Sequence, residues 1–174
     1  MKTIFNRPVV VGLISFLLLS IAVVGAQAQS KSLTLTSLDG QPVTLDSMRG
    51  KVVVLAFGGS HIPLDRTLLP QLQRLASRYP NDKVSVIWAP TNSSRAGARG
   101  YASDDDLRAF AARYGFKGPV LRDQDGAFRQ FGGQQLPIIV IFDKQGNLHG
   151  SPHAGMDPDE DIVNELSSVI DRLL

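Results

Sequence analysis

The sequence predicts an α/β fold in which helices flank a central mixed β-sheet, with a β-hairpin on the N-terminal side. Three apolar runs of strand length, at residues 52–57, 84–89 and 137–142, are typical of strands that are buried on both faces. A helical pattern separates the first two runs, which favours a right-handed crossover between parallel strands. A turn signal follows the third run at residues 143–146, so an antiparallel strand should complete the sheet.

The first predicted elements are a hairpin and a kinked helix. Leucine and valine side chains alternate on both sides of Asp39 and Gly40, which predicts two short strands joined at this turn. A pair of glycines ends the first apolar run, and a helix is predicted over residues 63–79. Pro70 should bend this helix, because proline lacks an amide hydrogen. The apolar face of the helix is formed by Leu68, Leu72, Leu75 and Tyr79.

The middle of the chain contains a polar loop, a capped helix and two short elements. Residues 90–102 are rich in glycine, serine and arginine, and we expect them to form an exposed loop. Ser103 and Asp106 have the spacing of a capping box, which predicts the start of a helix. A short extended piece at 120–121 and a short helix at 126–131 should follow.

The predicted fold ends with a strand around residues 147–153 and a final helix. Asp157 is predicted to be the N-cap of this helix, with Pro158 at the first position and the acidic Glu160 at the third. The buried face of the helix should be formed by Ile162, Leu166, Val169, Ile170 and Leu173.

The first 28 residues have the features of a secretory signal peptide. Lys2 and Arg7 are followed by an uncharged apolar run, and the segment ends in an Ala-Gln-Ala motif that is typical of a cleavage site. Cleavage after Ala28 would leave residues 29–174 as one exported domain, periplasmic or secreted. The alternative is an uncleaved segment that anchors the protein in the membrane, although 16 apolar residues (9–24) are few for a span.

The composition excludes several classes of function. The sequence contains no cysteine, which excludes disulfides, zinc–thiolate sites, iron–sulfur clusters and cysteine nucleophiles. The formal net charge of +2 comes from Lys2 and Arg7, so the remainder of the chain is neutral. The pI of about 9.1 is therefore no support for nucleic-acid binding.

Four segments in the same order resemble the redoxin branch of the thioredoxin-like superfamily. This branch includes exported thiol–disulfide oxidoreductases and the alkyl hydroperoxide reductase/thiol-specific antioxidant proteins. The resemblance covers residues 33–174 and implies a thioredoxin-like fold with a redox role. The four segments read LTSLDGQPVTLDSMRGKVVVLAF, RTLLPQLQRLASRYP, DDDLRAFAARYGFKGPVLRDQDGAFRQFGG and LPIIVIFDKQGNLHG.

The sequence departs from this family at the position of its chemistry. The family places one cysteine, or a Cys-x-x-Cys pair, at the start of the kinked helix, where the helix N-terminus activates a thiolate. Here Ile62 stands at the first of these positions and Asp65 at the second. Neither side chain can form a thiolate, a mixed disulfide or a sulfenic acid. The resemblance therefore implies the fold, whereas these residues exclude the thiol mechanism.

A binding groove is predicted where the family binds its substrate chain. The resemblance places Leu136 and Pro137 beside the active loop, with the Leu136–Pro137 peptide bond usually cis. The groove would be formed by Ser60, His61, Ile62, Pro63, Leu64, Asp65, Leu136 and Pro137. We expect no cofactor, and we expect the partner to be another exported protein or a peptide rather than nucleic acid.

The three histidines offer weaker alternatives. His61 and Asp65, four residues apart, suggest either an acid–base pair or, more simply, a solvated histidine and an acid at a helix N-terminus. His61, His149 and His153 are candidate metal ligands, but Gly150 and Pro152 leave their geometry open. The sequon that begins at Asn92 is short enough to occur by chance.

Charge near the polar loop has a simple interpretation. Arg95 and Arg99 are followed closely by three consecutive aspartates, which predicts a solvated surface of mixed charge.

Three functions remain open from the sequence: a redox-inactive binding module, a family oxidoreductase or antioxidant protein that relies on an external thiol or a metal, and a metal-handling protein that uses histidines.

Overall fold

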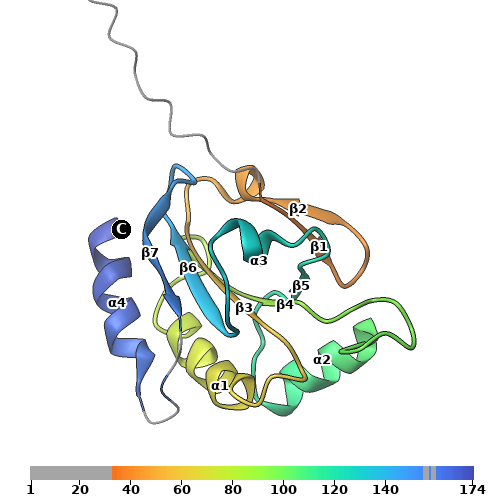
Figure 1. Ribbon diagram of the computed structural model, residues 1–174. Coiled ribbons are helices and arrows are strands. Elements are labelled where there is room, and N and C mark those ends of the chain that lie inside the picture. Colours follow the sequence, from red (N-terminus) through yellow and green to blue (C-terminus); the bar gives the residue numbers. More distant parts are fainter. Residues whose placement is uncertain (1–32, 155–156, 158–159) are drawn as a thin grey trace, which may run out of the picture.

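The structure, a computed structural model, describes residues 33–154, 157 and 160–174 (Figure 1). The predicted signal peptide, residues 1–28, lies outside this part of the chain. Within the described residues no helix combines the length and the apolar character needed to cross a membrane.

The described strands form two sheets. The larger sheet has the order β4-β3-β6-β7, with bounds Val84–Pro90, Val52–Gly58, Ile138–Phe142 and Leu148–Ala154. β3 and β4 are parallel, whereas β3–β6 and β6–β7 are antiparallel, so the prediction of a mixed sheet is confirmed. The smaller sheet has the order β2-β1-β5, with bounds Pro42–Thr44, Thr34–Ser37 and Leu121–Arg122. All β1 pairings are antiparallel, which confirms the N-terminal hairpin.

Alternation along β3 divides the core between the two faces of the larger sheet. Val52, Val54 and Ala56 face the helices α1 (Asp65–Ala76), α2 (Asp104–Arg113) and α4 (Ile162–Leu173). Val53, Leu55 and Phe57 face the hairpin and the short helix α3 (Ala127–Gln130). Figure 1 shows this layering, with α1 and α4 side by side. Because both faces are covered, β3 is buried along its whole length, as its apolar run predicts.

The predicted helix boundaries agree with the structure in α2 and differ in α1 and α4. The Ser103–Asp106 capping box is present at the start of α2. α1 ends at Ala76, so Tyr79 lies beyond the helix, where its hydroxyl donates to Asp171 Oδ1 at 2.8 Å.

The predicted start of α4 at Asp157 is wrong. The N-cap is Asp161, whose carboxylate accepts from the amide of Val163 at 2.9 Å. A side chain of α1 also fixes this boundary: Gln71 Oε1 accepts from the amide of Ile162 at 3.0 Å, and Gln71 Nε2 donates to the carbonyl of Glu160 at 3.2 Å. This contact between distant segments satisfies the first turn of α4, and the local cap pattern could not reveal it.

Candidate functional site

The candidate site lies at the carboxyl end of β3, where the chain turns into α1 through residues 59–64. We call these residues the active loop. The carbonyl of Gly58 accepts from both the amide and the hydroxyl of Thr91, at 2.8 and 3.0 Å, which fixes this end of the strand against the segment after β4. Phe57 is paired with Ile138 on the other side, so the Leu136–Pro137 bond, which is cis, lies next to Gly58. The predicted loop and the predicted proline are therefore brought together.

Asp65 is buried beneath this loop rather than exposed on it. Its side chain has no exposed area, although it begins α1 directly after the half-buried Leu64. Asp65 Oδ2 accepts from the amide of Gly59 and from Trp88 Nε1, the latter at 3.0 Å. A side chain at Gly58 would overlap the Asp65 carboxyl. The carboxyl thus fills the space beside Gly58, and its bonds from Gly59 and Trp88 tie the loop to β4.

The electrostatic environment of Asp65 disfavours its charged form. Burial raises the pKa of Asp65 from 3.8 to about 7, and the hydrogen bonds from Gly59 and Trp88 only partly oppose this rise. Asp65 Oδ1 has no hydrogen-bond partner, and it is the only such buried side-chain oxygen or nitrogen in the described chain. Both donors contact the other oxygen, so a protonated carboxyl suits this site better than a carboxylate.

Asn92 holds the loop from the opposite side. Its Oδ1 accepts from the amide of Ser60 at 2.9 Å. Its Nδ2 lies within hydrogen-bond distance of Ser60 Oγ at 3.1 Å, His61 Nδ1 at 3.2 Å and the carbonyl of Gly100 at 2.9 Å. The side chain is almost fully buried. One amide therefore ties the loop 59–64 to the polar loop 91–102.

Arg122 supports Asn92 from below and is also buried. Its guanidinium pairs with Asp104 at 2.6 Å and donates to the carbonyls of Asn92 and Ala102, at 3.3 and 2.6 Å. A buried arginine with a carboxylate and two carbonyls as acceptors is well satisfied. This pair links β5 to the start of α2 and so positions the whole polar loop.

The predicted groove residues divide into exposed and buried positions. His61 and Pro63 are exposed, and Ser60, Ile62, Leu64 and Leu136 are half-buried, so these six side chains reach the surface. Asp65 and Pro137 are buried and contribute only from below. On its other side, Pro137 borders a hollow of about 250 Å³ that is lined by Ile139, His153, Ala154, Glu160, Ile162 and Glu165. A larger hollow of about 550 Å³ lies beside Val84–Val86, at the far end of β4.

The structure separates the three histidines and the suggested His61–Asp65 pair. His61 contacts Asn92, whereas Asp65 contacts Gly59 and Trp88. His153 Nδ1 lies 3.1 Å from Glu165 Oε1 on α4, and His149 is exposed opposite Ile141. No three histidine, aspartate or glutamate side chains gather closely enough to hold a metal ion in the described residues.

Asn92 and Arg122 are the two site residues that the sequence did not reveal. The sequence marks Asn92 only as the first residue of a sequon, whereas in the structure its Nδ2 donates hydrogen bonds inside the protein. One feature of the sequence could have indicated a role for Asn92: it directly follows an apolar parallel strand, and ligand sites form at the carboxyl ends of such strands. Arg122 offered no comparable signal, since its partners are distant in the sequence.

Comparisons with known proteins show the family to which the sequence is similar. A model described as the AhpC/TSA family matches residues 24–151. The thiol-disulfide oxidoreductase ResA of Halalkalibacterium halodurans is 25% identical over 146 residues, which are 83% of this chain and 77% of that protein. The thioredoxin-like protein YneN of Bacillus subtilis is 27% identical over 118 residues, 68% of this chain and 65% of that protein.

Solved structures agree with the fold. A thioredoxin-like protein from Aeropyrum pernix superposes with a TM-score of 0.65 at 25% identity, covering 81% of this chain and 89% of that one. The exposed lipoprotein thioredoxin Etrx1 of Streptococcus pneumoniae superposes with a TM-score of 0.57 at 27% identity, covering 79% of this chain and 98% of that one. The predicted thioredoxin-like fold is confirmed.

Proposed function

This chain belongs to the AhpC/TSA family, and on that premise we propose that it is a redox-inactive member that binds an extended polypeptide segment. One observation carries the proposal: the active loop, the following helix and the adjacent cis proline are all present, while the sequence contains no cysteine. Thiol–disulfide exchange requires attack by a thiolate on a disulfide sulfur. Ile62 and the buried Asp65 offer no such nucleophile.

The surface around the loop supports a binding role. Ile62 and Leu64 on the loop, and Leu136 next to the buried Pro137, have partly exposed apolar side chains. The loop that carries them is held by Asn92 and by Asp65, so its shape is fixed before any partner arrives. A preorganised surface loses less conformational entropy on binding. An extended segment that pairs with backbone beside Pro137 would bind as an added strand, a mode that needs no thiol.

Disulfide trapping tests this binding directly. The Ile62→Cys variant places a single thiol on the loop, and Asp65 remains, so no second thiol can resolve a mixed disulfide. We expect an extended apolar peptide with one activated cysteine to form a mixed disulfide faster with Ile62→Cys than with Leu148→Cys, an exposed control on β7. A competing peptide of the same sequence without the cysteine should slow mixed-disulfide formation with Ile62→Cys but not with Leu148→Cys. Equal rates without competition would contradict the proposal.

Export is a second part of the proposal. It is supported by the signal-like residues 1–28 and by the likeness to an exposed lipoprotein thioredoxin. Mass spectrometry of the protein recovered outside the cytoplasm should show Gln29 at the new N-terminus. An intact Met1 in the membrane fraction would instead identify the segment as an anchor.

The alternative function is the oxidoreductase activity that the name of the ResA relative states. It would require an external thiol, because the sequence supplies none. Insulin reduction with a chemical reductant discriminates the two functions. We expect the rate with the purified protein to equal the rate of the reductant alone.

A further inference from the structure

Two exposed arginines, Arg95 and Arg99, lie on the polar loop that Asn92 ties to the candidate site. In the described residues the guanidinium of neither one has a hydrogen-bond or ion-pair partner. The backbone amide of Arg95 donates to Ser93 Oγ at 3.1 Å. The loop is closed by the pairing of Ser93 with Tyr101 and contacts the active loop through Gly100, which lies against the His61 ring. Arg99 therefore directly precedes the residue that contacts His61, and Arg95 lies four residues earlier on the same loop.

In the described residues, the aspartates that follow this loop form no ion pair with Arg95 or Arg99. The side chains of Asp105 and Asp104 are 95% and 46% exposed, so this surface carries both signs of charge, as the sequence predicts. Asp104 pairs with the buried Arg122 at 2.6 Å, and Asp105 pairs with Arg108 at 3.0 Å. Asp106 is used in the capping box with Ser103. All three carboxylates are thus engaged within the α2 region, which leaves Arg95 and Arg99 available.

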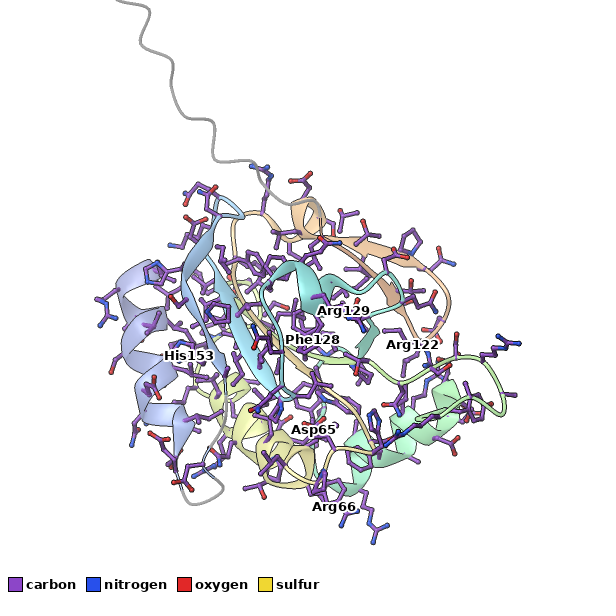
Figure 2. All side chains as sticks on the ribbon, viewed as in Figure 1. Asp65, Arg66, Arg122, Phe128, Arg129 and His153 are labelled. Atoms are coloured by element: carbon purple, nitrogen blue, oxygen red, sulfur yellow. The ribbon has the colours of Figure 1, made fainter. Side chains whose placement is uncertain are left out.

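A third unpaired arginine belongs to the same end of the molecule. Arg66 is exposed on the first turn of α1, and Figure 2 shows it projecting outward from that helix. The segments that make up the site, residues 58–68, 91–102 and 132–137, contain three arginines and one acid. That acid is Asp65, which is buried under the loop and has no exposed area. The accessible charge of these three segments is therefore positive, although residues 29–174 are neutral as a whole and the exposed Asp104 and Asp105 lie just beyond the second segment.

We propose that the bound polypeptide segment is acidic, with carboxylate side chains that flank an apolar residue. This inference rests on the proposed binding function and adds the chemistry of the partner. Guanidinium groups bind carboxylates through two parallel hydrogen bonds, so Arg66, Arg95 and Arg99 would contact aspartate or glutamate. The apolar residue would lie on Ile62 and Leu64. Complementary charge of this kind selects partners and speeds their association.

Three peptides with one shared apolar centre test the inference. Their flanking residues are glutamate, glutamine or lysine, and each carries a fluorescent label for anisotropy measurements. We expect the glutamate peptide to bind about tenfold more tightly than the glutamine peptide at low salt, since three exposed ion pairs are each worth a few tenths of a kcal/mol. The lysine peptide should bind most weakly. The advantage of glutamate should shrink as salt is added.

A pair of triple variants locates the effect. Arg66→Gln with Arg95→Gln and Arg99→Gln should abolish the preference for the glutamate peptide over the glutamine peptide. The matched control removes the same charge from exposed cations elsewhere, through Lys83→Gln, Lys117→Gln and Arg172→Gln, and should keep the preference.

The other outcomes separate the two proposals. Equal binding of all three peptides would overturn the acidic preference and leave the groove intact. Failure of every peptide to bind would overturn the binding function itself. Vesicles of anionic phosphatidylglycerol are the last comparison: binding to vesicles through the same arginines, without any preference among peptides, would identify a lipid surface and overturn the inference.

Discussion

The contacts of the Asp65 carboxyl explain how the loop keeps its shape, and the resemblance to thiol-bearing proteins predicts that Asp65 occupies the position of their second cysteine. The carboxyl accepts from the amide of Gly59 and from Trp88 Nε1, and no solvent reaches it. Its pKa of about 7 lies above the ordinary value of 3.8, because burial penalises the charge. Asp65 thus acts as a structural acid at the start of α1.

The stability of the protein should depend on pH through Asp65. The folded state holds its proton up to about pH 7, whereas the unfolded chain releases it near pH 4. The contribution of Asp65 to the free energy of unfolding is therefore largest below pH 4, falls as the pH rises towards 7, and is constant above pH 7. The loss is about 1.4 kcal/mol for each pH unit crossed. Asp65→Asn keeps an acceptor for both donors and should remove this decline.

Urea denaturation from pH 4 to pH 8 measures this effect. Above pH 7 we expect Asp65→Asn to be more stable than the wild-type protein. The matched control is Asp125→Asn, which removes an exposed carboxyl before α3 and should leave the pH profile parallel to that of wild type. Parallel profiles for Asp65→Asn and wild type would show that Asp65 is charged in the folded protein.

At the scale of the element, α4 depends on its apolar face and on α1. Leu166 is 1% exposed within the core formed by α1, α2, α4 and one face of the sheet. Leu166→Ala should lower the free energy of unfolding by about 2–5 kcal/mol, as large-to-small changes in a core do. The exposed Asn164→Ala on the same helix is the control, and it should change the midpoint little. An unchanged midpoint for Leu166→Ala would mean that α4 is not packed against α1.

Local signals predicted elements more accurately than they predicted boundaries. The apolar runs that became β3, β4 and β6 were recognised because strands covered on both faces need continuous apolar sequence. The capping box of α2 was predicted because all its partners lie within four residues. The start of α4 was not, because it depends on Gln71, 91 residues away from Ile162. Elements satisfied by tertiary contacts are therefore the ones that sequence patterns misplace.

At the scale of the whole molecule, the scaffold should support thiol chemistry once thiols are supplied. Ile62→Cys with Asp65→Cys creates a Cys-x-x-Cys pair at the start of α1, beside the cis Pro137. The first thiol should titrate below the free value of about 8.5, because of the helix N-terminus and the neighbouring thiol. Insulin reduction should be absent in wild type, slight in Ile62→Cys and measurable in the double variant.

The control for this prediction separates the second thiol from the loss of Asp65. Ile62→Cys with Asp65→Ser removes the same carboxyl but adds no second thiol. Circular dichroism should first establish that both double variants fold, since Gly59 and Trp88 lose an acceptor worth about 1–3 kcal/mol for each donor left unpaired. A folded Cys-x-x-Cys variant that stays inert, with a thiol pKa near 8.5, would show that the loop does not activate a thiol.

The sequence predicted which segments of the chain meet at the candidate site, but it did not predict the electrostatics there. The positions of Ile62, Asp65 and Pro137 followed from a resemblance that spans nearly the whole domain, and the loop and proline do meet. The burial of Asp65, the amide of Asn92 and the buried pair of Arg122 with Asp104 could not be predicted. Each depends on side chains from different loops that meet only in three dimensions.

The overlap between a side chain at Gly58 and the Asp65 carboxyl also constrains how this protein can evolve. The two positions share one small volume, so a larger residue at one is compatible only with a smaller residue at the other. Gly58→Ala should be harmful in the present background and tolerated once Asp65 has become alanine. The order of substitutions therefore matters: a chain that carries Asp65 can accept a larger residue at position 58 only after the acid has been replaced by a smaller side chain.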